Sequence, residues 1–133
     1  MESLPLRLSP GVDLRRSLEE LAHGKSFSGA FVIAGIGSLS QARLRFANAT
    51  AEAEVEGPLE ILTIGGTITL DGAHLHIAVA DEHGRVQGGH VGYGNIVRTT
   101  AELLLLRVPG WQLSRGLDPR TGYNELKVHK REA

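Results

Sequence analysis

Three closely spaced histidines are the residues of this chain best suited to chemistry. His74 and His76 flank a single leucine, and His90 follows the pair Gly88-Gly89. On a β-strand, residues i and i+2 project from the same face, so His74 and His76 can direct both imidazoles toward one point. Imidazole is a common ligand of zinc, and three histidines on zinc leave one position open for water or substrate. The spacing therefore predicts a metal site in which His74, His76 and His90 bind Zn²⁺ or a similar divalent ion.

The position of His90 depends on how the two histidine-bearing segments pair. Residues 74–80 and 85–91 are expected to form an antiparallel hairpin, in which directly opposed residues share one face. A five-residue loop over 81–85 pairs residue 76 with 90, and a three-residue loop pairs 74 with 90; both place all three histidines on one face. A four-residue loop turns His90 to the other face unless a bulge at Gly88-Gly89 restores it. The metal hypothesis thus predicts an odd loop or a glycine bulge.

Other interpretations of these residues remain open at this point. The three histidines could instead be ordinary polar residues on an exposed sheet face, or hydrogen-bonding groups at a subunit interface. Glu60, between Leu59 and Ile61, is the candidate catalytic residue, as an acid/base group, a group that orients a metal ligand, or an extra ligand. The alternative for Glu60 is an edge or interface carboxylate.

Composition restricts the class of protein. The chain has 133 residues, 41% of them hydrophobic and 22% charged, which is typical of a single globular domain over residues 1–133. Its 14 basic and 15 acidic residues give a net charge of −1, which argues against a strongly electrostatic binder of nucleic acid or membranes. Cysteine is absent, so disulfides and cysteine catalysis are excluded. Without a signal-peptide pattern or an apolar run of ~18 residues, a cytoplasmic protein is expected.

One helix and many short strands are predicted to position these residues. Alternation over residues 4–8 predicts a first strand, and Asp13 is expected to cap a helix over 14–23 that ends at Gly24. The apolar stripe of that helix is expected to be Leu14, Leu18 and Leu21. Further strands, separated by glycine-containing turns, are predicted over 30–36, 42–46, 59–64, 67–70, 75–80, 85–91 and 126–128.

Residues 100–107 are ambiguous, because four consecutive leucines favour a helix by propensity while a short, dense apolar run also suits a buried strand. Many strands with one clear helix predict an α+β domain.

Two further patterns do not indicate a ligand site. Gly35-Ile36-Gly37 lacks the third glycine of a dinucleotide-binding fingerprint, and Gly88-Gly89 is not followed by the Lys-Ser/Thr pair of a phosphate-binding loop. The basic residues are scattered along the sequence and are interpreted as a solvated surface. They include Arg43, Arg45, Arg98, Arg107 and Arg115, with Lys127, Lys130 and Arg131 near the end of the sequence.

Blocks along most of the chain resemble the PPC (plants and prokaryotes conserved) domain, in its prokaryotic stand-alone form. The similar segments are Arg7-Leu8 with Pro10 to Leu14, Gly35 to Leu39 with Ala42 to Leu44, Gly57 to Gly66, His74-Leu75-His76 with Gly84 and Gly88-Gly89-His90, Ala101-Glu102, and Thr121-Gly122 before Glu125-Leu126. The resemblance implies an α+β fold with a largely antiparallel twisted sheet, one main N-terminal helix and a homotrimeric assembly. It also implies that residues 100–107 form a strand, and that the histidine cluster holds a metal such as zinc in a pocket near a subunit boundary.

The resemblance also raises a DNA-binding function, because many bacterial members are named as DNA-binding proteins. The plant members carry an Arg-Gly-Arg-Pro AT-hook ahead of this domain, and this sequence contains no such segment. The first hypothesis is therefore a homotrimeric protein with a three-histidine metal site. The second is a DNA-associated regulator, with a basic face built from Arg43, Arg45 and residues 127–131. The third is a metal-dependent hydrolase or lyase that uses Glu60 as the acid/base group.

Overall fold

The computed structural model describes residues 2–132. These residues form one helix, with one strand before it in the sequence and seven strands after it. In chain order the elements are β1 (Glu2–Leu8), α1 (Leu14–Gly24), β2 (Ala30–Arg45), β3 (Ala53–Thr69), β4 (Gly72–Ala80), β5 (Val86–Val91), β6 (Ile96–Arg107), β7 (Trp111–Asp118) and β8 (Tyr123–Lys130). This is the α+β fold with one N-terminal helix that the sequence predicted.

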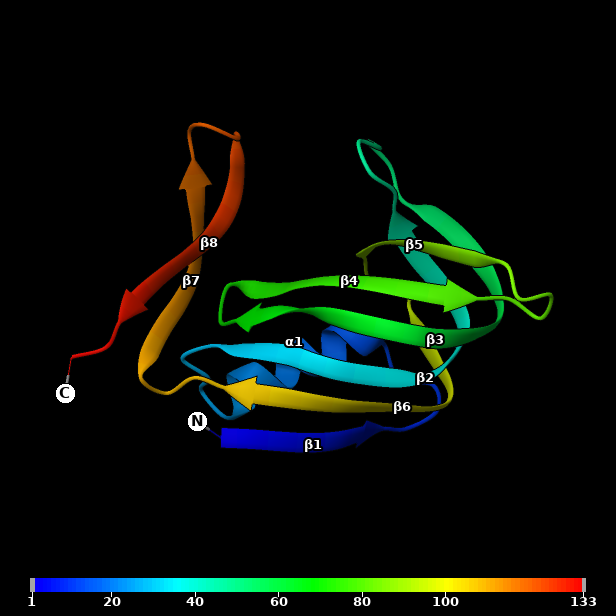
Figure 1. The fold of residues 1–133 in the computed structure, drawn as a ribbon, viewed down its shortest axis with the longest axis horizontal. Helices are drawn as coiled ribbons and strands as arrows, with labels where there is room; N and C mark the ends of the chain where they lie inside the picture. Colours follow the sequence, from blue (N-terminus) through cyan, green and yellow to red (C-terminus); the bar gives the residue numbers. More distant parts are fainter. Residues whose placement is uncertain (1, 133) are drawn as a thin grey trace.

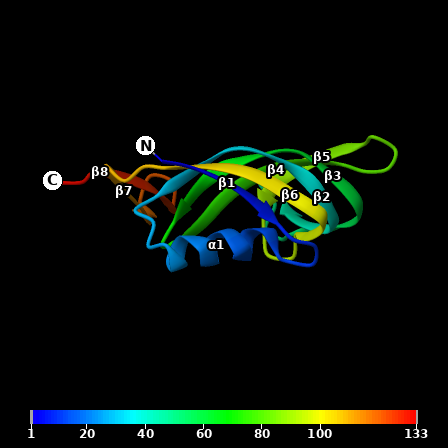
Figure 2. The same cartoon turned by 90° about the horizontal axis from the view of Figure 1, so that it is seen from below.

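Six of the strands form one antiparallel sheet in the order β1-β6-β2-β3-β4-β5. At its far edge β5 leaves β4 and pairs with the end of β2, through Leu44↔Val91 and Arg45↔His90, so the sheet curls back on itself. Helix α1 covers one face of the sheet (Figure 2), and within residues 2–132 no second helix covers the opposite face. The β7–β8 hairpin forms a second sheet that stands beside the end of the first (Figure 1).

Helix α1 begins as predicted, because the Asp13 carboxylate accepts a hydrogen bond from Arg16 N at 3.0 Å. Its fully buried residues are Leu14, Leu18 and Ala22, whereas Leu21 is only partly buried. The helix ends one residue later than predicted, with Gly24 still helical. No helix within residues 2–132 is long and apolar enough to span a membrane.

Two pairs of predicted strands are continuous in the structure. Residues 30–36 and 42–46 both belong to β2, and residues 59–64 and 67–70 fall largely within β3. The glycines that indicated strand ends bend the strands without ending them: Gly37 and Gly66 adopt φ values of +153° and +146°. Bulges in the ladders near Gln41 and Thr63 add to the bending. The resulting curvature carries the end of β2 to β5.

Residues 100–107 form the second half of β6, as the family resemblance implied. β6 lies between β1 and β2, and Ala101, Leu103 and Leu105 are buried while the residues between them are more exposed. Pairing on both sides and burial on alternate positions outweigh the helix propensity of the leucines. Strand β7 had no counterpart in the sequence prediction.

Gly66 is a packing constraint directly beneath the histidines. A Cβ at this position would collide with the carbonyl oxygen of His74 on β4, and the positive φ disfavours any L side chain. Gly110 is a matched control, because a Cβ there meets no atom within 4 Å and its φ is not in the positive range.

We expect Gly66→Ala to lower the free energy of unfolding by about 2–4 kcal/mol, from backbone strain combined with overpacking. Gly110→Ala should change it by less than about 0.5 kcal/mol. Urea unfolding followed by circular dichroism measures both. An equal free energy of unfolding for the two variants would contradict this expectation, because it would show that β3 and β4 move apart to accommodate the added methyl group without loss of stability.

Candidate metal centre

The β4–β5 hairpin has one of the two registers compatible with a three-histidine site. Ala80 pairs with Val86 and His76 pairs with His90, which is the five-residue loop, one of the two odd loops left open by the sequence. Asp81 holds this loop closed: its carboxylate accepts hydrogen bonds from His83 N and Arg85 N, both at 2.9 Å. Because opposed residues share a face, His90 lies on the same side as His76.

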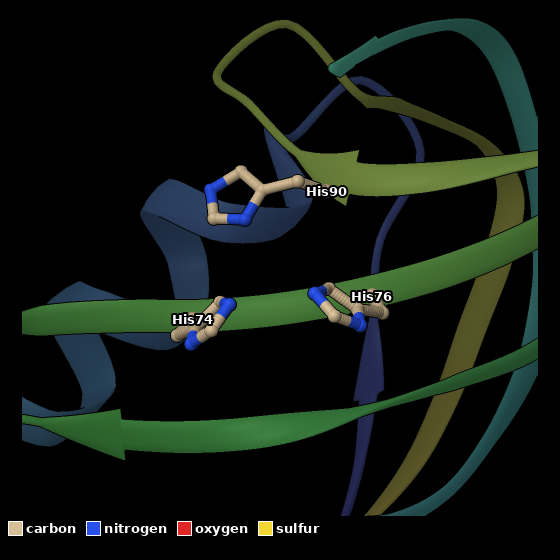
Figure 3. A group of neighbouring side chains, drawn as sticks. All are labelled: His74, His76 and His90. Atoms are coloured by element: carbon tan, nitrogen blue, oxygen red, sulfur yellow. The ribbon is translucent and has the colours of Figure 1, made fainter. Parts of the chain in front are cut away.

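All three histidines converge on one point (Figure 3). The ring centroid of His74 lies 5.1 Å from the ring centroid of His76 and 5.1 Å from that of His90. The ring centroids of His76 and His90 are 6.1 Å apart. One nitrogen from each ring lies within 4.8 Å of the others. Two nitrogens on a tetrahedral zinc ion lie roughly 3.4 Å apart, given Zn–N bonds of about 2.0–2.1 Å. Small side-chain rotations reach that spacing, so the donor set fits a divalent ion.

The sequence around the histidines explains why they face outward together. Along β4, Leu75, Ile77 and Val79 are buried in the core, which leaves the alternate positions 74 and 76 on the face that α1 does not cover. Opposite them on β3 stand Thr67 and Gly65. The absence of a side chain at Gly65 leaves space beside His76, and both residues line one surface depression.

The electrostatic surroundings hold two of the rings neutral. Burial lowers the pKa of His74, the positive charge of Arg115 lowers it further, and Glu125 opposes both effects. Burial, with the neighbouring His74 and Arg45, lowers the pKa of His90 to about 4. Neutral imidazole is the form that binds a metal ion. A lowered pKa therefore favours the form of these two rings that can bind a metal ion.

A cleft of about 540 Å³ extends from the histidines toward the β7–β8 hairpin. Its charged lining consists of Arg15, Arg45, Arg115, Asp71 and Glu125. Arg115 connects β7 to the sheet, because its backbone N–H donates to Asp71 at 2.9 Å and its guanidinium donates to the Thr67 hydroxyl. Burial lowers the pKa of Arg115, and the Glu125 carboxylate acts in the opposite direction.

Arg15 reaches the cleft from α1 and is fixed by other contacts. Its guanidinium donates to the Val91 carbonyl at 3.1 Å and to the Glu19 carboxylate at 3.3 Å. Glu19 in turn accepts hydrogen bonds from the Tyr93 hydroxyl at 2.6 Å and from Ala73 N at 2.8 Å. Burial would raise the pKa of Glu19, but these hydrogen bonds and the Arg15 charge outweigh it and lower that pKa. This network ties the helix to the start of β4, one residue before His74.

Glu60 lies away from the cluster. It is exposed and stands opposite Ala80, four residues along β4 from His76, which corresponds to roughly 13 Å at the strand rise of about 3.3 Å per residue. The carboxylate that lies beside the histidines is Glu125, on β8. Sequence reasoning missed Glu125, Arg15, Arg45 and Arg115 as site residues.

Comparisons with known proteins agree with this fold. The model of the Plants and Prokaryotes Conserved (PCC) domain matches residues 1–109. A bifunctional protein GlmU from Synechococcus sp. (strain JA-2-3B'a(2-13)) is 46% identical over 124 residues, which is 93% of this chain and 20% of that protein. The chain thus spans about one fifth of the length of the curated relatives that it matches.

Three solved structures are similar over almost the whole chain. A hypothetical protein from Salmonella enterica is 34% identical with a TM-score of 0.95, over 98% of this chain and 95% of that one. A metal-containing protein from Archaeoglobus fulgidus is 27% identical with a TM-score of 0.81, over 94% and 92%. A candidate DNA-binding protein from Ralstonia eutropha JMP134 is 25% identical with a TM-score of 0.82, over 92% and 89%.

Proposed function

This chain belongs to the Plants and Prokaryotes Conserved (PCC) domain family, and on that basis we propose that it is a cytoplasmic, homotrimeric metal-binding protein. The proposed ligands are His74, His76 and His90, and the proposed ion is Zn²⁺ or a similar divalent metal. The observation that carries the proposal is the convergence of three imidazoles, each with a nitrogen within 4.8 Å of the others. The similar protein from Archaeoglobus fulgidus, described as metal-containing, supports it.

Three protein ligands leave a coordination position free for water or for an atom of a substrate. A zinc ion bound there would act as a Lewis acid and lower the pKa of a bound water. A metal-dependent hydrolase or lyase is therefore the enzymatic form of this proposal. Glu125 lies nearer to the histidines than Glu60 and is the better placed acid/base group for it.

The first prediction concerns metal content. Protein purified without an affinity tag should contain about one divalent ion per chain by inductively coupled plasma mass spectrometry, and His74→Ala/His76→Ala should contain none, because one ligand cannot retain the ion. The matched control is His83→Ala/His129→Ala, which removes two exposed histidines far from the cluster. An equal metal content in both double variants would assign the metal to another place, and its absence from all three proteins would remove the proposal.

The uncovered face of the sheet supports assembly into a trimer. Five large apolar side chains are exposed on the central strands β2, β3 and β6 of the sheet: Phe31, Ile33, Ile36, Leu62 and Leu104. In these strands, residues next to the exposed side chains are buried in the core that α1 covers. Because side chains alternate along a strand, the exposed side chains point away from that core. Large apolar side chains exposed together on one face of a sheet are typical of a subunit interface. A homotrimer would bury this face and bring subunit boundaries close to the histidines.

We predict that the protein elutes with three times the mass of one chain in size-exclusion chromatography with light scattering. Ile36→Glu/Leu62→Glu should shift it to the monomer, because each buried interface carboxylate would lack a partner. Leu117→Glu, at an exposed position of the β7–β8 hairpin, is the control and should remain trimeric. A wild-type monomer would contradict the assembly, and circular dichroism checks that each variant is folded.

A DNA-associated regulator is the second candidate function, favoured by the description of the similar Ralstonia eutropha protein. It requires a basic surface, which the net charge of −1 does not supply. Arg43, one of the residues proposed for such a surface, is paired with Glu52 at 3.4 Å.

We therefore expect no salt-sensitive binding of the trimer to AT-rich duplex DNA in fluorescence anisotropy, even at low ionic strength. Micromolar binding that weakens steeply with added salt would establish the DNA function instead. In that case Arg45→Gln and Lys127→Gln should each reduce the salt dependence, because each phosphate contact contributes to counterion release.

A further inference from the structure

We propose that the cleft beside the histidines binds a small oxyanion, a carboxylate or a phosphate, which Arg45 and Arg115 recognise while the anion occupies the open position of the metal. This inference rests on the proposed metal site. It adds the chemical class of the ligand, which the metal site alone does not define.

The first support is a row of side chains across three strands. His76 pairs directly with His90, and His90 pairs directly with Arg45 on β2. Directly opposed residues share a sheet face, and adjacent strands lie about 4.8 Å apart. The Arg45 guanidinium is therefore carried by the same face as the two imidazoles, one strand away from His90.

The second support is that Arg45 is largely uncommitted. Within residues 2–132, its one side-chain hydrogen bond is a long contact of 3.5 Å from Nη1 to the Ala49 carbonyl, and no carboxylate forms an ion pair with it. A guanidinium has five N–H donors in a planar fork that matches the geometry of carboxylate and phosphate. Arg15 differs, because Glu19 and the Val91 carbonyl already hold it.

Arg115 faces the same space from the opposite side. It is carried by the β7–β8 hairpin, and it lines the cleft with His74 and His90. The guanidinium is partly buried, and Thr67 accepts from only one of its nitrogens. Two arginines thus flank the histidine cluster from β2 and from β7, with the cluster between them.

The charge balance of the cleft favours an anion. Its charged side chains are three arginines and two carboxylates, Asp71 and Glu125, and a divalent ion on neutral histidines adds two positive charges. Asp71 is partly engaged, since it accepts the backbone N–H of Arg115. The excess of positive charge in a cleft partly shielded from water is lowered when an oxyanion enters.

The test is isothermal titration calorimetry on the zinc-loaded trimer with two probes, inorganic phosphate and malonate, which separate the phosphate and carboxylate forms of the ligand. At least one probe should bind. Arg45→Gln should weaken that binding about ten- to hundredfold, the range for a lost charge-assisted hydrogen bond, while its zinc content stays at the wild-type value. Arg45→Lys should recover part of the affinity. Arg85→Gln, in the exposed loop at the other end of the β4–β5 hairpin, is the matched control and should bind like the wild type.

A second readout places the anion at the metal. Addition of the bound probe to protein loaded with Co²⁺ should change its visible absorption, because the anion enters the coordination sphere. Failure of both probes to bind the zinc-loaded protein, or equal binding by Arg45→Gln and wild type, would overturn the oxyanion proposal and leave the metal site intact. A protein that takes up no metal fails at the loading step, before any probe is added, and that result removes both proposals.

Discussion

The pairing of β4 with β5 is the constraint on which the candidate site depends. Side chains alternate between the two faces of a strand, so a slip of one residue would turn His90 away from His76. Asp81 prevents that slip, since its carboxylate and carbonyl oxygens bind three of the backbone N–H groups that close the five-residue loop. The strand that leaves this loop continues past β4 to β2, where His90 meets Arg45. One turn therefore determines both the convergence of the three histidines proposed as metal ligands and the position of Arg45 beside them.

The histidine face could be predicted from the sequence because it depends on local rules. Strand alternation and the parity of the loop length restrict His90 to two faces, and both odd loops give the same result. The choice between the five- and three-residue loops depends on hydrogen bonds of Asp81 that no spacing reveals.

Strand ends were harder to predict. Gly37 and Gly66 indicated turns, but the long strands β2 and β3 use them to bend, because close contact with neighbouring backbone excludes a side chain there. Likewise, the leucines of β6 form a strand because β6 pairs with β1 and β2, although their intrinsic propensity favours a helix.

The charged lining of the cleft could not be predicted from the sequence. Arg15 lies on the helix, Arg45 at the end of β2 and Arg115 on β7, so they are separated by 30 and 70 positions along the chain. Three independent features bring them together: the Glu19 network that fixes Arg15, the curl of the sheet that pairs β2 with β5, and the contact of Arg115 with Thr67. None of these features leaves a periodic pattern. Glu125 is similar, because the β7–β8 hairpin was only half recognised.

This placement of the arginines also separates a nucleic-acid interface from a small-molecule site. Binding to duplex DNA depends on cations spread over a surface that follows the phosphate backbone, where each releases counterions. Here three arginines line one cleft of about 540 Å³, and Arg43, Arg107 and Arg120 are each paired with a carboxylate. Assembly of chains that each carry a formal net charge of −1 multiplies that charge and does not by itself create a basic surface. A cleft of this size admits a small anion and not a double helix. The basic residues that look scattered in the sequence therefore favour a small-molecule ligand over DNA.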